Sequence, residues 1–206
     1  MSATNCWKGS SVDYGHFDRD EAGITSAKII IAGGFGSGKT TFVGTLSEIK
    51  PLRTEATMTA ASIGIDETAA VPSKTSTTVA MDFGRISLGG DLVLYLFGTP
   101  GQHRFWFMWD DLVHGAIGAV VLVDTRRLAD CFAAIDFFES RGLPFIIAIN
   151  RFENTHEHPT EDVRAALAID SRIPIIPCDA RSAQSAKQAL IVATEHAMSR
   201  LGASIP

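Results

Sequence analysis

The chain has 206 residues, of which 46% are hydrophobic, and these values suffice for one globular domain with a full core. Its formal net charge of -5 argues against a nucleic-acid partner, because a protein that follows a phosphate backbone presents a basic surface. There is no apolar stretch near the roughly 20 residues of a membrane span, no paired cysteine spacing and no signal-peptide core. We therefore expect a cytoplasmic protein that does not insert into a membrane and reaches one, if at all, through a partner.

Residues 1–26 are polar and mixed in charge and are interpreted as a flexible leader, followed by a single domain over residues 27–206. In that domain short apolar runs alternate with segments of helical periodicity, which is typical of a mostly parallel sheet with helices on both faces. Six strands are predicted, at residues 27–33, 78–88, 91–97, 117–124, 144–149 and 173–178. Helices are predicted near residues 39–49, 103–113, 127–141, 160–169 and 183–201.

Two features interrupt this alternation. Residues 78–88 and 91–97 are separated only by a Gly-Gly turn signal, so we expect one antiparallel edge hairpin in the sheet. Residues 50–77 are rich in Thr, Ser and Ala and cannot bury much apolar surface alone. A structureless loop of this length is expected to be either a ligand-ordered switch or a plain mobile insertion.

The strongest motif is KIIIAGGFGSGKTTF, in which residues 33–40 fit G-x-x-x-x-G-K-[ST] between a predicted strand and a predicted helix. Its glycines let consecutive backbone N–H groups surround a phosphate, and the helix start adds further unpaired N–H groups. In this motif Lys39 contacts the β- and γ-phosphates and the Thr40 hydroxyl coordinates Mg²⁺. We therefore predict a three-layer P-loop NTPase fold of the α/β class. The predicted phosphate-binding residues are Gly33, Gly36, Ser37, Gly38, Lys39, Thr40 and Thr41.

Residues 150–153, Asn-Arg-Phe-Glu, follow an apolar strand and are close to the N-K-x-D pattern of guanine-nucleotide-binding proteins. A carboxylate at the fourth position accepts from the guanine N1–H and 2-amino groups, whereas adenine leaves that charge unpaired. Here the carboxylate belongs to Glu153, and Arg151 replaces the lysine whose stem covers the base. With Asn150 these are the predicted base-site residues. Because Glu153 is longer than aspartate, a P-loop ATP-binding protein is kept as an alternative.

Five segments, GGFGSGKTT, KTSTTVAMDFG, LFGTPGQHRF, NRFE and CDARS, occur in the order found in small Ras-like GTPases, which the chain resembles. It is most similar to their prokaryotic branch, which includes the gliding-motility polarity GTPase and the GTPase component of actinobacterial conservon operons. The resemblance implies a GTP/GDP switch in bacterial signalling, with Mg²⁺ as cofactor and a roadblock-fold protein as regulatory partner. In CDARS it implies that Ala180 and Arg181 form a base-site loop in which the Ala180 N–H points to guanine O6.

The resemblance also assigns roles around the γ-phosphate. Thr78 is expected to complete the Mg²⁺ coordination and sense that phosphate, Gly101 to contact it, and Gln102 to orient the attacking water. With Lys39, Thr78 and Gln102 are the predicted catalytic residues.

Family members usually carry an acid three residues before that glycine, where it holds a metal-bound water, but this chain has Gly98. The prokaryotic branch also lacks the acid. A three-residue hairpin turn would set Asp82 opposite Gly98 on the same face of the sheet, where it can assist Mg²⁺ together with Thr40 and Thr78. A two-residue turn would set Asp82 opposite Phe97 on the other face. The sequence leaves both registers open, and Asp82 can also be an outward charge that protects an edge strand.

No arginine is evident as a built-in arginine finger, although Arg53 and Arg104 are candidates. We therefore expect slow GTP hydrolysis that an activating partner accelerates. A nucleotide-binding interaction module with little hydrolysis is the alternative. The apolar cluster at residues 105–109 is expected to pack partly on the sheet and partly against a partner.

Overall fold

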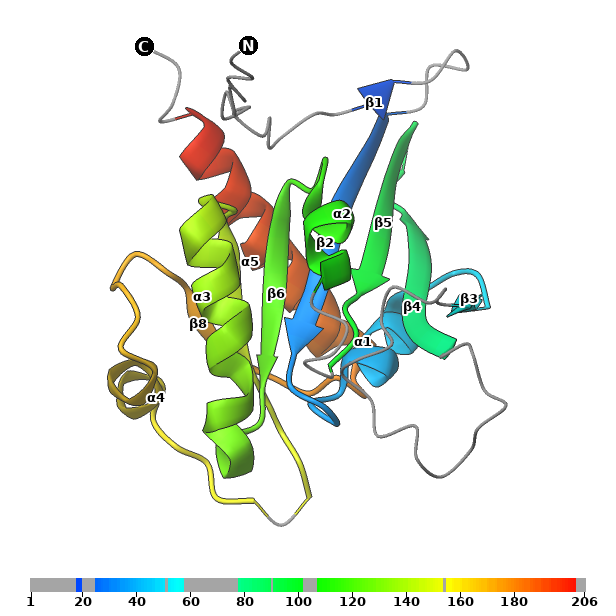
Figure 1. Ribbon diagram of the computed structural model, residues 1–206. Helices are drawn as coiled ribbons and strands as arrows, with labels where there is room; N and C mark the ends of the chain where they lie inside the picture. Colours follow the sequence, from blue (N-terminus) through cyan, green and yellow to red (C-terminus); the bar gives the residue numbers. More distant parts are fainter. Residues whose placement is uncertain are drawn as a thin grey trace, which may run out of the picture.

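The computed structural model describes residues 18–19, 25–50, 52–57, 78–89, 91–101, 107–153 and 155–202. These contain one sheet in the order β3-β4-β5-β2-β6-β7-β8, with β1 paired to the start of β2 (Figure 1). The strands are β1 (Asp18–Arg19), β2 (Thr25–Gly33), β3 (Leu52–Thr57), β4 (Thr78–Ser87), β5 (Leu92–Gly98), β6 (Gly118–Val123), β7 (Phe145–Asn150) and β8 (Ile175–Cys178). The helices are α1 (Lys39–Leu46), α2 (Trp109–Val113), the 3₁₀ helix η4 (Thr125–Cys131), α3 (Phe132–Arg141), α4 (Thr160–Leu167) and α5 (Ala183–Gly202).

The predicted fold class is confirmed. Strands β5, β2, β6, β7 and β8 run parallel, and β4 is antiparallel to β5. Every residue of β6 is buried, in agreement with its continuous apolar sequence GAVVLV. Such runs are typical of parallel strands that helices cover on both faces.

The sheet also contains two strands that the sequence did not predict. The expectation of a structureless segment over residues 50–77 is wrong for β3, which pairs antiparallel with β4 and lies outside the hairpin. Strand pairing uses backbone groups, so the segment needs few apolar side chains to join an open sheet edge. Strand β2 begins at Thr25, and β1 pairs with it inside the segment interpreted as a leader. Residues 58–77 lie outside the described residues.

The core forms two layers because successive residues of each strand face opposite sides of the sheet. In β2, Ile29 and Ile31 pack in a cluster with residues of α1 and α5. Ile30 and Ala32 pack in a second cluster with residues of α2, α3 and α4. In Figure 1, α3 lies in front of the sheet, and α1 and α5 lie behind it.

Two helix starts differ from the prediction. Helix α3 begins at Phe132 because residues 125–131 form η4, with a break at Arg127 (φ -142°, ψ 50°). Helix α2 begins at Trp109, and residues 103–106 of the predicted helix lie outside the described residues. Trp109 is buried against the rings of Phe137 and Phe138, as expected for part of the aromatic cluster, whereas Phe107 is exposed. Among the described residues, no helix has the length and apolar character to cross a membrane.

The packing predicts a large loss of stability for Phe138→Ala. Phe138 is fully buried, and its ring lies 5.6 Å from that of Phe137 and 5.9 Å from that of Phe145, measured between centroids. We expect a loss of about 3–5 kcal/mol in the free energy of unfolding, measured by urea denaturation. Phe132→Ala in the same helix is the control, since Phe132 is 39% exposed and its loss should stay below about 1 kcal/mol. Equal losses in the two variants would contradict this core assignment.

Candidate nucleotide-binding site

Most of the predicted site residues that the structure describes gather at one edge of the sheet. The loops after β2, β6, β7 and β8 leave the carboxyl ends of parallel strands, at the lower end of the sheet in Figure 1. Ligands of open α/β sheets bind at this edge. Gly33 ends β2 and Lys39 begins α1, so the glycine-rich motif forms the turn between them. No side chain caps the start of α1, which leaves its first N–H groups available to an anion.

Lys39 lies over this turn. Its side chain is buried and its Nζ donates to the carbonyl oxygens of Gly33 and Gly34, at 2.9 and 2.7 Å. Burial lowers the pKa of Lys39 to about 8, and the nearby charge of Asp82 opposes this shift. Gly101 lies close by, because a Cβ added to it would be 2.8 Å from the Lys39 Nζ. The lysine therefore lies where the P-loop and the Gly101 loop meet.

Asp82 lies next to Thr40. The hairpin has the register of a three-residue turn, with Leu88 donating its N–H to the Leu92 carbonyl and Asp82 opposite Gly98. The Thr40 hydroxyl donates to Asp82 Oδ2 at 2.6 Å. A side chain at position 98 would crowd this carboxylate, since an added Cβ would lie 3.1 Å from the Asp82 Cβ and 3.4 Å from Oδ2.

This oxygen pair fits Mg²⁺. Hydroxyl and carboxylate oxygens are the hard ligands that Mg²⁺ prefers, and it is usually held by one or two protein side chains together with phosphate oxygens. The described residues contain no group of three or more His, Cys, Asp or Glu side chains that could hold a metal. Thr40 and Asp82 are therefore the side chains from which a magnesium site would be built, with a nucleotide supplying further oxygens.

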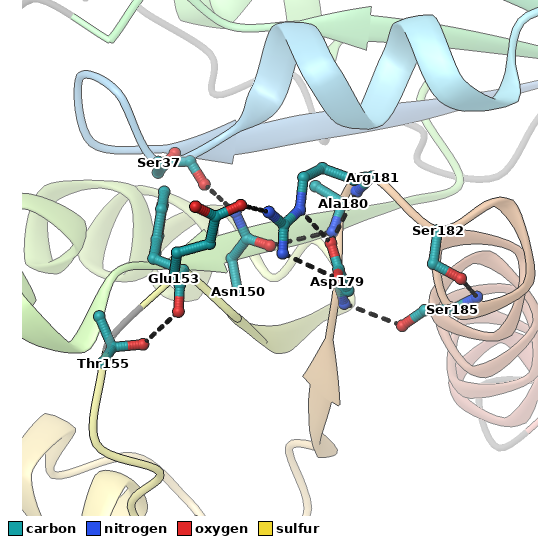
Figure 2. Close-up of polar contacts among 10 residues, drawn as sticks. Ser37, Asn150, Glu153, Thr155, Asp179, Ala180, Arg181, Ser182 and Ser185 are labelled. Atoms are coloured by element: carbon teal, nitrogen blue, oxygen red, sulfur yellow. Dashed lines mark hydrogen bonds and ion pairs between the residues drawn. The ribbon is translucent and has the colours of Figure 1, made fainter.

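Asn150 connects the phosphate loop to the base-site loop. It is buried, its Nδ2 donates to the Ser37 carbonyl at 2.9 Å, and its Oδ1 accepts from the Ala180 N–H at 3.0 Å (Figure 2). A Cβ at Gly38 would lie 2.4 Å from Asn150 Nδ2, and Gly38 has φ of 103°, so this approach requires glycine. The Ala180 N–H, expected to point to guanine O6, donates to Asn150 instead.

A cavity of about 380 Å³ extends from the P-loop to this second loop. Its lining residues are Gly36, Gly38, Thr41, Arg126, Asn150, Arg151, Phe152, Glu153, Ala180 and Arg181. Glu153 Oε1 accepts from Arg181 Nη1 at 2.8 Å (Figure 2), and Arg151 pairs with Glu157 at 2.5 Å. The structure thus brings the predicted phosphate residues and base-site residues around one cavity.

Sequence reasoning missed two arginines in the loop after β6. Arg126 lines the cavity with its guanidinium 4.1 Å from the centroid of the Phe152 ring, and its Nη2 donates to Asp124 at 2.7 Å. Hydrogen bonds from Arg126 hold the pKa of Asp124 below its usual value. Arg127 donates to the Phe35 carbonyl in the P-loop at 3.4 Å and pairs with Asp130. An Asp-x-Arg sequence directly after a buried strand was the available signal.

For four other predicted residues the structure gives either the strand pairing alone or no description. Thr78 is the first residue of β4, opposite Thr57 of β3, and Arg53 is opposite Asp82 in the same pairing. Gln102 and Arg104 lie outside the described residues.

Residues 31–200 match a protein family described as "Conserved hypothetical ATP binding protein". The chain belongs to this family. It is also 30% identical over 126 residues to an uncharacterized protein of Methanocaldococcus jannaschii, covering 60% of this chain and 69% of that relative.

Solved structures of iron-transporter G domains have the same fold. The G domain of the T. maritima FeoB iron transporter superposes with a TM-score of 0.59 at 16% identity, covering 84% of this chain and 99% of that one. The cytosolic domain of the same transporter, in a GDP form, gives 0.60 at 15% identity and covers 84% and 64%. The FeoB G domain from Methanococcus jannaschii gives 0.54 at 15% identity and covers 82% and 98%. At these identities the likeness establishes a P-loop G-domain fold and nothing finer.

The position of Asn150 predicts that Asn150→Ala destabilises the nucleotide-free protein. The substitution leaves the Ser37 carbonyl and the Ala180 N–H without their partner in a buried place, so we expect a loss of about 2–4 kcal/mol in urea denaturation. Thr155→Ala is the control, because it removes one bond to the Phe152 carbonyl within a loop and should cost about 1 kcal/mol or less. An Asn150 variant as stable as the control would show that this amide does not hold the site together.

Proposed function

We propose that the chain is a guanine-nucleotide switch that binds GTP and GDP together with Mg²⁺. The observation that carries the proposal is the continuous cavity between the P-loop glycines and the Glu153 carboxylate, with buried Asn150 joining its two ends. A nucleotide lying along it would have its phosphates at the start of α1 and its base near Glu153. Guanine suits this arrangement because its N1–H and 2-amino groups are donors to a carboxylate.

Competition of unlabelled GTP, GDP and ATP against a fluorescent GDP analogue tests this proposal. Guanine nucleotides are expected to bind at least about 100-fold more tightly than ATP, since adenine lacks the N1–H and 2-amino donors from which Glu153 would accept. Equal competition by ATP would contradict the guanine assignment.

ATP binding is the second candidate function. The description of the family favours it. So does the ion pair between Glu153 and Arg181, because a carboxylate that already has a cationic partner is less costly to leave beside adenine. In that case the likeness to G domains would concern the fold alone.

Several residues would act around the γ-phosphate in the proposed switch. Lys39, now hydrogen-bonded to two P-loop carbonyls, would exchange them for phosphate oxygens, and Thr40 and Asp82 would hold Mg²⁺. Bound there, Mg²⁺ would neutralise charge on the phosphates. The resemblance to Ras-like GTPases supports Thr78 as the residue that senses the γ-phosphate and Gln102 as the residue that orients the attacking water.

The same resemblance supports a bacterial signalling role, a cytoplasmic location and a roadblock-fold regulatory partner. The exposed side chain of Phe107, which follows Gln102 in the sequence, is consistent with a partner surface there.

Asp82→Asn is predicted to weaken the dependence of GDP binding on Mg²⁺. The asparagine oxygen can still accept from Thr40, but the negative charge next to the metal position is gone. We expect the ratio of the GDP dissociation constants without and with Mg²⁺ to fall by about tenfold, measured by fluorescence titration. Asp91→Asn is the matched control, since Asp91 is exposed in the turn of the same hairpin and its ratio should not change. An unchanged ratio in Asp82→Asn would show that Asp82 does not contribute to the metal site.

Hydrolysis is predicted to be slow in the isolated protein. The arginines beside the P-loop are already paired, Arg126 with Asp124 and Arg127 with Asp130, and an arginine finger must be free to reach the γ-phosphate. Single-turnover hydrolysis of bound GTP should therefore proceed at about 10⁻³ s⁻¹ or slower. A rate of about 1 s⁻¹ without any partner would contradict this expectation.

A further inference from the structure

In the part of the chain that the structure describes, three arginines are each held by the carboxylate of the aspartate two residues earlier. In each case the backbone N–H and Nε of the arginine donate to Oδ1 of the aspartate and Nη2 donates to Oδ2, at 2.7–3.1 Å. The pairs are Asp124 with Arg126, Asp170 with Arg172, and Asp179 with Arg181. This bracing fixes a guanidinium that would otherwise move freely, so little entropy is lost when it binds a ligand.

Arg181 is braced at the base end of the nucleotide cavity. It lines that cavity together with Glu153, and its Nη1 donates across to Glu153 Oε1 (Figure 2). Of the five N–H donors of a guanidinium, three are used by Asp179 and Glu153, which leaves two for a ligand. Glu153 Oε2 accepts from none of the described residues.

The backbone of the same loop has no spare donor. The N–H groups of Asp179, Ala180 and Arg181 donate to Ser185 Oγ at 2.9 Å, Asn150 Oδ1 at 3.0 Å and Asp179 Oδ1 at 2.9 Å. The Ala180 bond is buried, so breaking it for a ligand would leave Asn150 unsatisfied. A donor from this loop to a base therefore has to be the Arg181 side chain.

We propose that Arg181 determines base specificity by donating to the 6-oxygen of guanine, while Glu153 accepts from N1–H and the 2-amino group. This inference rests on the proposed guanine-nucleotide function. Guanine presents an acceptor next to two donors, which complements a guanidinium next to a carboxylate with a free oxygen. Adenine presents its donor and acceptor in the reverse order at positions 6 and 1 and has no 2-amino group.

The ion pair can admit the base at small cost. The side chains of Arg181 and Glu153 are 50% and 81% exposed, and exposed pairs contribute little to stability. Asp179 keeps Arg181 in position while Glu153 turns toward the base. Hydrogen bonds from Arg181 also hold the pKa of Asp179 below its usual value, so the brace stays charged at neutral pH.

The test compares GDP with the diphosphate of 2-aminopurine riboside, which keeps the 2-amino group but lacks the 6-oxygen and the N1 proton. The full-length wild type should bind GDP more tightly, and Arg181→Ala should reduce this preference by about tenfold, the value of one charged hydrogen bond. Arg181→Gln, which keeps a single donor, should retain part of it. The preference for GDP over inosine diphosphate, which reports on the 2-amino group and Glu153, should change little in Arg181→Ala.

Arg172→Ala is the matched control, because Arg172 has the same brace from Asp170 but lines a different cavity, with Phe138 and His196. It should bind every nucleotide like the wild type. If Arg181→Ala weakens GDP and the 2-aminopurine nucleotide by the same factor, Arg181 only positions the loop and the inference is overturned while the proposed function stands. If the wild type binds ADP as tightly as GDP, the guanine function itself is overturned.

Discussion

The buried amide of Asn150 is the interaction on which the rest of the site depends. One side chain at the end of strand β7 satisfies a carbonyl of the phosphate loop and an N–H of the base-site loop. Leaving a buried backbone group without a partner costs more free energy than a typical hydrogen bond contributes. Both loops are therefore held firmly to β7. Gly38 lets the loop approach this amide, and the cavity between phosphate and base ends follows from that approach.

The second constraint is the register of the β4–β5 hairpin. A three-residue turn sets Asp82 opposite Gly98 and beside Thr40, whereas a slip of one residue would move the carboxylate to the other face of the sheet. A carboxylate absent from one strand is thus available from its neighbour, because cross-strand partners have Cβ atoms only about 5 Å apart. The pairing of β3 on the outside of β4 adds a further strand that holds this register.

Much of the fold could be predicted from the sequence, because buried parallel strands such as β6 and β7 are continuous apolar runs and the P-loop motif fixes the strand-to-helix turn. The register of the hairpin could not be predicted from the sequence, because the Gly-Gly pair is compatible with a turn of either two or three residues. Strand β3 was missed because LRTEAT has little apolar signal and pairs through its backbone. The hydrogen bond from the Ala180 N–H to Asn150 depends on side-chain conformations that short motifs do not encode. The same holds for the bonds that fix Arg126 and Arg181, although the repeated Asp-x-Arg spacing is visible in the sequence.

In the proposed site, Asp82 of the neighbouring strand supplies the acid at the metal position, and the Arg181 side chain supplies the donor to the base. A crystal structure of the full chain with GDP and Mg²⁺ tests this account most directly. We expect the Thr40 hydroxyl to turn from Asp82 to the metal and Asp82 to accept from a metal-bound water. We also expect Arg181 and Glu153 to contact the guanine edge. A complex in which the Thr40–Asp82 bond stays intact and the base lies away from Glu153 would contradict it.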